Sequence, residues 1–202
     1  MEAIMSSEVE VFNGTKALEI TAENIRKYIP NANQATDQEL TVFLNLCSMY
    51  RLNPFKREIY FIKYGNNDPQ IVTGYETFLK RAERTGNLDG WYFEEDQVIE
   101  ENNKRDYKVT LVIHRKDWNH PFKHTVYFSE ISQYHRDKKT GEMVLNTMHK
   151  KMPRFMTKKT CISQGFRMCF PDEFGGMPYT DAEMAIETTD YKVIEQIGRA
   201  HV

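Results

Sequence analysis

The sequence has no apolar run long enough to cross a membrane, and its N-terminus lacks the basic and then apolar layout of a secretion signal. Cysteine is also scarce. Cys47, Cys161 and Cys169 form no C-x-x-C pair and lie in apolar segments with helical spacing. Such thiols are typical of buried positions in a reducing compartment. We therefore expect a soluble cytoplasmic protein that makes no membrane contact.

The chain has no excess of positive charge, since it contains 27 Lys and Arg residues and 29 Asp and Glu residues, which gives a formal net charge of −2. This balance excludes a uniformly basic nucleic-acid coat, so any such binding needs a segregated patch. No G-x-x-x-x-G-K-[ST] loop occurs, which argues against a P-loop ATPase. We find no internal repeat or low-complexity tract. At 202 residues with 40% apolar side chains, the chain fits one globular domain with flexible ends.

Acidic residues are missing from the segment 143–171, around which the chain is organised. This segment holds six basic residues: Lys150, Lys151, Arg154, Lys158, Lys159 and Arg167. Pro153 suits the first position of a helix, and the pattern after it is helical down to Phe170. A core-facing stripe is expected at Phe155, Ile162, Phe166 and Cys169.

A second row of the same helix is basic at one end and small at the other. It consists of Arg154, Lys158, Cys161 and Gly165. Helix N-termini normally attract acidic residues, and each cation there costs roughly a few tenths of a kcal/mol. A phosphate backbone approaching this row would neutralise that charge. The alternative is the solvated basic face of an ordinary amphipathic helix, with Lys159 extending its stem over the apolar side.

The rest of the chain predicts helices and short strands. Residues 1–15 are expected to be a flexible tail, 17–21 a strand, and the following helix to end at Tyr28 before Pro30. Thr36 and Glu39 form a capping box that begins a core helix. Further elements are a hairpin of 57–64 with 70–73, a helix at 75–84, strands at 91–95, 108–116 and 122–128, and a helix at 181–195. The fold class is therefore α+β, an antiparallel sheet bracketed by helices.

The last six residues, 197–202, resemble translated sequencing-adapter DNA, so we expect this tail to be non-native and the chain to be truncated. The expected organisation is a tail at 1–15, one main domain at 16–180, and the start of a C-terminal helical segment at 181–196.

Several motifs between residues 36 and 172 resemble those of the RecT/Redβ (Bet) family of phage single-strand annealing proteins. They are LNPFKREIY at 52–60, GY at 74–75, AERTG at 82–86, DG at 89–90, RKD at 115–117, NHP at 119–121, and Pro153, Met156, Gln164, Arg167 and Phe170 at the family's spacing. No one motif is decisive, but their order and spacing are specific.

The resemblance implies ATP-independent annealing of complementary single-stranded DNA in phage recombination and DNA repair, without enzymatic catalysis. It implies a small antiparallel sheet with packed helices, distantly like eukaryotic Rad52 annealing domains. It implies no cofactor, with Mg²⁺ only influencing DNA binding. The implied partners are single-stranded DNA, further copies of the chain in a ring or helical filament, a phage 5′→3′ exonuclease and the single-strand binding protein of a bacterial host.

The resemblance also places basic DNA contacts at Arg57, Lys116 and Arg154. The chain departs from the family at His149, where Trp is frequent, and at Thr160, where Lys is expected. With the acid-free segment, the expected DNA-binding set is Arg57, Lys116, Lys150, Lys151, Arg154, Lys158, Lys159 and Arg167.

Other function classes remain open at this point. Asp172 after Pro171, followed by Asp190 and Lys192, imitates the signature of metal-dependent nucleases, which bring two carboxylates and a Lys to Mg²⁺. A passive coat would bind single strands without pairing them. Two further sets of residues are expected to be structural, although each has an alternative role. Zinc binding is the alternative for His114, His120 and His124, and base stacking is the alternative for Tyr75, Phe78, Trp91 and Trp118.

Overall fold

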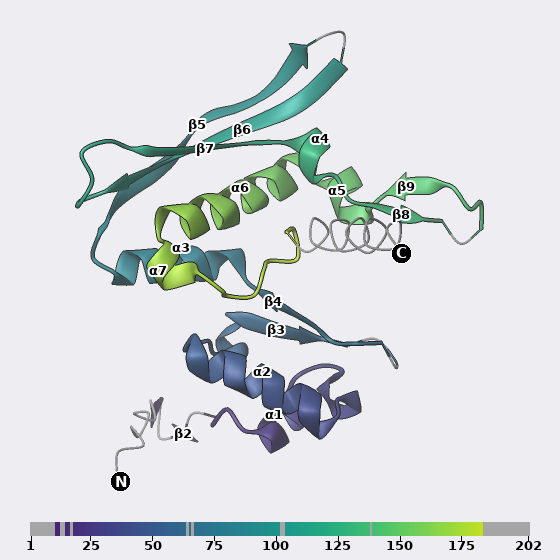
Figure 1. The fold of residues 1–202 in the computed structure, drawn as a ribbon. Coiled ribbons are helices and arrows are strands. Elements are labelled where there is room, and N and C mark those ends of the chain that lie inside the picture. The colour runs from purple at the N-terminus through teal and green to yellow at the C-terminus, as the bar shows by residue number, and fades with distance from the viewer. Residues whose placement is uncertain are drawn as a thin grey trace, which may run out of the picture. The chain divides into compact units, whose positions relative to one another are not determined.

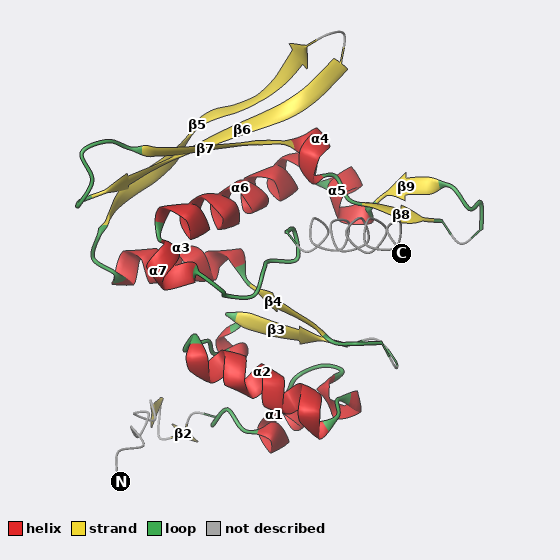
Figure 2. Cartoon of the chain, in the orientation of Figure 1, coloured by secondary structure: helices red, strands yellow, loops and turns green. Residues whose placement is uncertain are grey.

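The computed structural model describes residues 11–12, 15–16, 18–63, 65, 67–101, 104–137 and 139–183. It divides into two compact units, Met1–Ile71 and Val72–Val202 (Figure 1). Both units contain helices and antiparallel strands (Figure 2). The expected α+β class, with small antiparallel sheets packed against helices, is confirmed. Among the described residues, no helix is both long and apolar enough to cross a bilayer.

The first unit is built on two helices, α1 (Ala22–Tyr28) and α2 (Asp37–Met49). The predicted capping box is confirmed, because the Thr36 hydroxyl accepts from the Glu39 N–H at 3.2 Å and the Glu39 carboxylate accepts from the Thr36 N–H at 2.8 Å. The helical spacing of α2 predicts core positions at Leu40, Phe43, Leu44, Cys47 and Tyr50. Leu40, Phe43 and Cys47 are buried, whereas Leu44 and Tyr50 are half-buried, and Ile25 of α1 is buried as well.

Short elements complete this unit. They are β1 (Val11–Phe12), β2 (Thr15–Lys16), η1 (Ala32–Gln34), η2 (Pro54–Lys56) and β3 (Ile59–Ile62). Strand β3 pairs with β4 (Gln70–Thr73) as the predicted hairpin, and the division between the two units falls within β4. The predicted strand at 17–21 is wrong over its described residues. Leu18 and Ile20 are exposed, and Thr21 already serves as the N-cap of α1. Among the described residues of this segment, 18–20 form no strand.

The second unit has a three-stranded antiparallel sheet in the order β5–β6–β7, with β6 in the middle. Its elements are α3 (Tyr75–Arg84), β5 (Leu88–Glu101), β6 (Lys104–Arg115), β7 (Phe122–Tyr127), α4 (Phe128–Ile131), β8 (Tyr134–Arg136), β9 (Met143–Leu145), α5 (Thr147–Lys151), α6 (Pro153–Cys169) and α7 (Pro171–Phe174). Helix α6 lies between the sheet and α3 (Figure 1). The predicted bounds of α3 and α6 hold to within one residue.

Strands β5 and β6 are longer than the sequence pattern predicts, because they continue as a charged two-stranded ribbon beyond β7. The prediction required apolar alternation, which this ribbon lacks. The ribbon is held instead by pairing between β5 and β6, in which Glu100 lies directly opposite Arg105.

The small end of the row that begins at Arg154 packs against the sheet. The Cys161 thiol lies 3.5 Å from the His124 carbonyl oxygen, and a Cβ added at Gly165 would lie 2.7 Å from Leu111 Cδ2. The expectation that a phosphate backbone approaches this small end is therefore wrong. Strand β6 already occupies the space that the missing side chain leaves.

The core stripe of α6 is confirmed at Ile162, Phe166 and Cys169, which are buried. It is wrong at Phe155, which is 44% exposed in the first turn of the helix. The Phe155 side chain instead lies beside Tyr75 at the N-terminus of α3, where the two rings meet edge to face with centres 6.1 Å apart.

Several predictions fall outside the described residues. They concern most of the tail at 1–15, the helix at 181–195 beyond residue 183, and the adapter-like tail at 197–202. Residues 181–183 form a turn.

Replacing Gly165 with Val should lower the free energy of unfolding by about 1–3 kcal/mol, because the new methyl groups would overlap Leu111 in a filled core. Urea denaturation at constant m-value measures this loss. Met168→Val on the exposed side of the same helix is the matched control, and it should cost only the difference in helix propensity. Equal losses in the two variants would contradict the close packing.

Candidate nucleic-acid interface

The junction of α5 and α6 presents basic side chains to solvent. Asn146 caps α5 by accepting from the Met148 N–H at 3.0 Å, and Lys150, Lys151 and Arg154 follow, all exposed. Among the residues that the structure describes, none of these three has an acidic partner. Lys150 and Lys151 lie in the last turn of α5 and Arg154 in the first turn of α6, so the expectation that all three crowd one helix N-terminus is wrong. Their charge remains available to an anion.

Arg154 is directed by an aromatic neighbour on the sheet. Its guanidinium lies 5.5 Å from the centre of the Tyr107 ring on β6, within range of a cation–π contact. This contact limits the rotamers of a long side chain while leaving it exposed. Arg154 is thus the cation of this group that the fold orients best.

Lys158 lies one turn further along α6 and shares its charge with the sheet. Its ammonium forms an ion pair with Asp96 of β5 and lies 5.2 Å from the centre of the Phe93 ring. A phosphate at this position would compete with Asp96, so Lys158 offers a weaker anion contact than Arg154.

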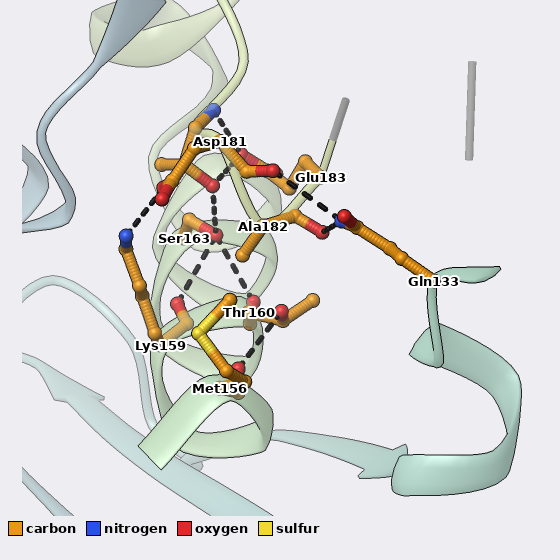
Figure 3. A network of polar contacts seen from close by, with 9 residues as sticks. Gln133, Met156, Lys159, Thr160, Ser163, Asp181, Ala182 and Glu183 are labelled. Atoms are coloured by element: carbon orange, nitrogen blue, oxygen red, sulfur yellow. Dashed lines mark hydrogen bonds and ion pairs between the residues drawn. The ribbon is translucent and has the colours of Figure 1, made fainter. Parts of the chain in front are cut away.

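Segment 178–183 covers a further row of α6, namely Lys159, Ser163 and Arg167. Figure 3 shows Lys159 directed toward Asp181 and Ser163 beside this segment. Lys159 forms an ion pair with Asp181, and the Ser163 hydroxyl lies 3.4 Å from that of Thr180. The two lysines that are adjacent in sequence, Lys158 and Lys159, therefore have partners on different elements.

Arg167 has the most internal contacts of the predicted set. Nη1 donates to the carbonyls of Phe174 and Met177 at 3.1 and 3.0 Å, and Nη2 lies 3.5 Å from the buried Glu183 carboxylate. Its guanidinium also lies 5.1 and 4.7 Å from the centres of the Phe78 and Tyr179 rings. This geometry gives Arg167 a structural role, that of tying segment 174–183 to α6.

Arg57 belongs to the first unit, in a turn that the LNPFKREIY motif builds from its own side chains. Asn53 Oδ1 accepts from the N–H groups of Phe55 and Lys56 at 2.9 and 3.2 Å, and the Glu58 carboxylate accepts from the Asn53 N–H at 3.0 Å. Arg57 follows with a left-handed φ of 59° and an exposed side chain. Asn53 and Glu58 of the motif therefore have a structural role, because they hold the turn that precedes Arg57.

Lys116 and Arg115 join two other motifs of the second unit. Lys116 Nζ donates to the Gly86 carbonyl at 3.0 Å, which ties RKD to AERTG. Arg115 donates to the Cys169 carbonyl at 2.6 Å and to both Asp117 oxygens at 2.9 and 2.5 Å. Arg115 thus stabilises the C-terminal end of α6.

Comparison with protein-family models matches residues 15–196 to the RecT family. The chain belongs to the RecT family. It is also 27% identical over 166 residues to the recombination protein bet of Escherichia phage lambda. That alignment covers 82% of this chain and 59% of the lambda protein, so the chain spans well under two thirds of its relative's length.

The predicted set of this RecT-family chain thus separates into groups. Lys150, Lys151 and Arg154 lie close together in sequence where α5 ends and α6 begins, while the remaining cations have internal contacts or lie on other elements. The assignment of all eight residues to DNA contacts stays a prediction.

His149, where the family frequently has Trp, is buried. The ring is 1% exposed and lies 6.2 Å from that of Phe128, and neither nitrogen has a partner among the described residues. Burial lowers the pKa of His149; the charge of Asp181 opposes this effect and that of Lys159 adds to it. The other departure, Thr160, is also buried, and its hydroxyl donates to the Met156 carbonyl at 3.0 Å.

The cysteines are free and buried, as the sequence predicts. Burial raises the pKa to about 12 for Cys47 and Cys161 and to about 11 for Cys169, so these thiols stay protonated at neutral pH.

The alternative sites find little support. In the part of the chain that the structure describes, no three His, Cys, Asp or Glu side chains gather to hold a metal ion. Asp190 and Lys192 of the nuclease-like signature lie outside the described residues. Phe78 is buried against Phe174, and Trp91 packs edge to face on Phe166, as expected of structural aromatics.

Replacing Arg167 with Met should lower the free energy of unfolding by about 3–5 kcal/mol, because the Glu183 carboxylate would stay buried without its cation. Arg167→Lys should recover only part of this loss, since an ammonium cannot replace the guanidinium fork. Urea denaturation measures both variants. Wild-type stability of Arg167→Met would show that the side chain has no structural role.

His149 should make the protein sensitive to mild acid. Its pKa in the fold lies below the unfolded value near 6.5, so the unfolded chain takes up the proton first as the pH falls. Stability should be full above pH 6.5 and decline below it by up to about 1.4 kcal/mol per pH unit. Unfolding curves between pH 8 and 5 should therefore diverge between wild type and His149→Phe. Parallel curves would contradict a buried neutral imidazole.

Proposed function

We propose that this chain binds single-stranded DNA and anneals complementary strands without ATP, in phage homologous recombination within the cytoplasm of a bacterial host. The observation that carries the proposal is membership of the RecT family over residues 15–196. The relative in phage lambda is itself a recombination protein. We assign no catalytic role to the chain.

The exposed cations at the junction of α5 and α6 support this function physically. Lys150, Lys151 and Arg154 lie in a segment, 143–171, without any acidic residue. Cations so placed hold the phosphates of one strand and release its counterions, while the bases stay unpaired. A second strand then tests pairing, and base pairing itself supplies both the sequence recognition and the driving free energy.

The other predicted cations are proposed to contribute to DNA binding in different ways. Arg57 and Lys116 are exposed and are proposed as further phosphate contacts. Lys158 contributes less, because it shares its charge with Asp96. We propose that Lys159 and Arg167 act mainly by holding segment 178–183 on α6, so that they influence DNA binding through the helix they stabilise.

Assembly and partners belong to the proposal as well, because the chain spans only 59% of the lambda protein. We propose that copies of the chain assemble on the strand as a ring or helical filament. A phage 5′→3′ exonuclease would supply the single strand, and the host single-strand binding protein would compete for it or hand it over.

The test is the rate at which two complementary, fluorescently labelled oligonucleotides pair without ATP. Wild-type protein should accelerate pairing strongly. Lys150→Glu with Lys151→Glu should remove most of the acceleration and flatten the dependence of log affinity on log salt by about 0.7 per lost phosphate contact. Lys27→Glu, which reverses an exposed charge on α1 outside every motif of the family, is the control and should behave as wild type.

Each alternative has its own signature in the same assay. A passive coat binds the oligonucleotides without accelerating their pairing. A nuclease shortens the strands when Mg²⁺ is added. Unchanged affinity in the double variant would leave annealing intact as a function but reject the α5–α6 junction as its site.

A further inference from the structure

An aromatic side chain stands next to the proposed phosphate contacts and has no role in the core. Phe155 follows Arg154 in the first turn of α6 and is 44% exposed. Two exposed methionines precede it, Met148 on α5 and Met152 at the cap between the two helices. Isolated apolar side chains are ordinary on a protein surface, but here three of them follow one another at a basic helix end.

The Phe155 ring is held in place by a neighbour from a distant part of the chain. Tyr75, at the N-terminus of α3, meets it edge to face, with ring centres 6.1 Å apart and planes inclined at 84°. Tyr75 is itself half-buried. A ring oriented in this way loses little side-chain freedom when a flat partner packs on it.

We propose that Phe155, supported by Tyr75, is a stacking site for unpaired bases of single-stranded nucleic acid. This rests on the proposed function and deepens it. Aromatic side chains beside a cationic track bind bases by stacking, and every base has a π-face, so such a site tolerates any sequence. Arg154 leans toward Tyr107 on the sheet while Phe155 leans toward α3, so phosphate and base would be held by adjacent residues.

The charge around the ring favours nucleic acid over a protein partner. Lys150, Lys151 and Arg154 are exposed within a segment that contains no acidic residue, and Lys159 Nζ lies 5.9 Å from the centre of the Tyr75 ring. One exposed carboxylate, that of Glu76, adjoins Tyr75 on α3, so the cations beside the two rings outnumber it. A polyanion that also carries flat apolar groups matches both the charge and the ring. A second copy of this chain, docking on the same apolar side chains, is the rival occupant that the experiment must exclude.

The experiment compares two ligands of equal length and charge, an oligothymidylate and an oligonucleotide of abasic sites. Affinities are measured for wild type, Phe155→Ala, Phe155→Tyr and Met168→Ala. Phe155→Ala should weaken oligothymidylate binding by roughly 5- to 150-fold for each base that stacks, and leave abasic binding and the salt slope unchanged. Phe155→Tyr should retain the affinity. Met168, 48% exposed near the other end of α6, provides the matched control and its truncation should change neither ligand.

Two results would overturn the stacking site. One is equal affinity of wild type and Phe155→Ala for oligothymidylate. The other is an equal loss on both ligands, or a change of sedimentation without DNA, which would make Phe155 part of a contact between copies. Phe155→Leu, which keeps apolar bulk without a flat ring, replaces Phe155→Ala if that variant does not fold. If wild type binds neither ligand, the proposed function fails and the stacking site with it.

Discussion

Close packing of α6 on strand β6 at Gly165 determines what every other row of this helix can do. The missing side chain lets the helix backbone approach Leu111, and Cys161 packs beside it on the same side. Once this side faces the sheet, the row containing Lys159 and Arg167 faces segment 178–183. The basic residues of one helix are thereby divided between the interior of the protein and its surface.

This division gives the same residue types different physical roles. Arg167 is surrounded by carbonyl groups, a carboxylate and two rings, and its positive charge stabilises the fold. Arg154 has one aromatic neighbour and remains exposed. A charge that is already paired inside a protein adds little to anion binding, because the anion must compete with the existing partner. Location, rather than residue type, therefore decides which cations can meet a phosphate.

The motifs that carry the family resemblance also have structural explanations. Asn53 caps the turn that holds Arg57 in its left-handed conformation. Lys116 ties its own motif to the loop at Gly86, and Arg115 stabilises the end of α6. A basic residue in a motif can thus be required for the fold. The motifs therefore identify the family, but they do not by themselves identify which residues contact DNA.

The sequence by itself determined the α+β class, the capping box at Thr36, the bounds of α3 and α6, and the acid-free segment with its family. These depend on local signals such as caps, proline positions and periodicity, which act within one or two turns. Only the tertiary structure decided that Phe155 is exposed, that Gly165 meets the sheet, and that Lys159 and Arg167 have internal partners. The reason is that those partners come from distant parts of the chain. Periodicity shows which residues of a helix share a side, but it does not show which other element packs against that side.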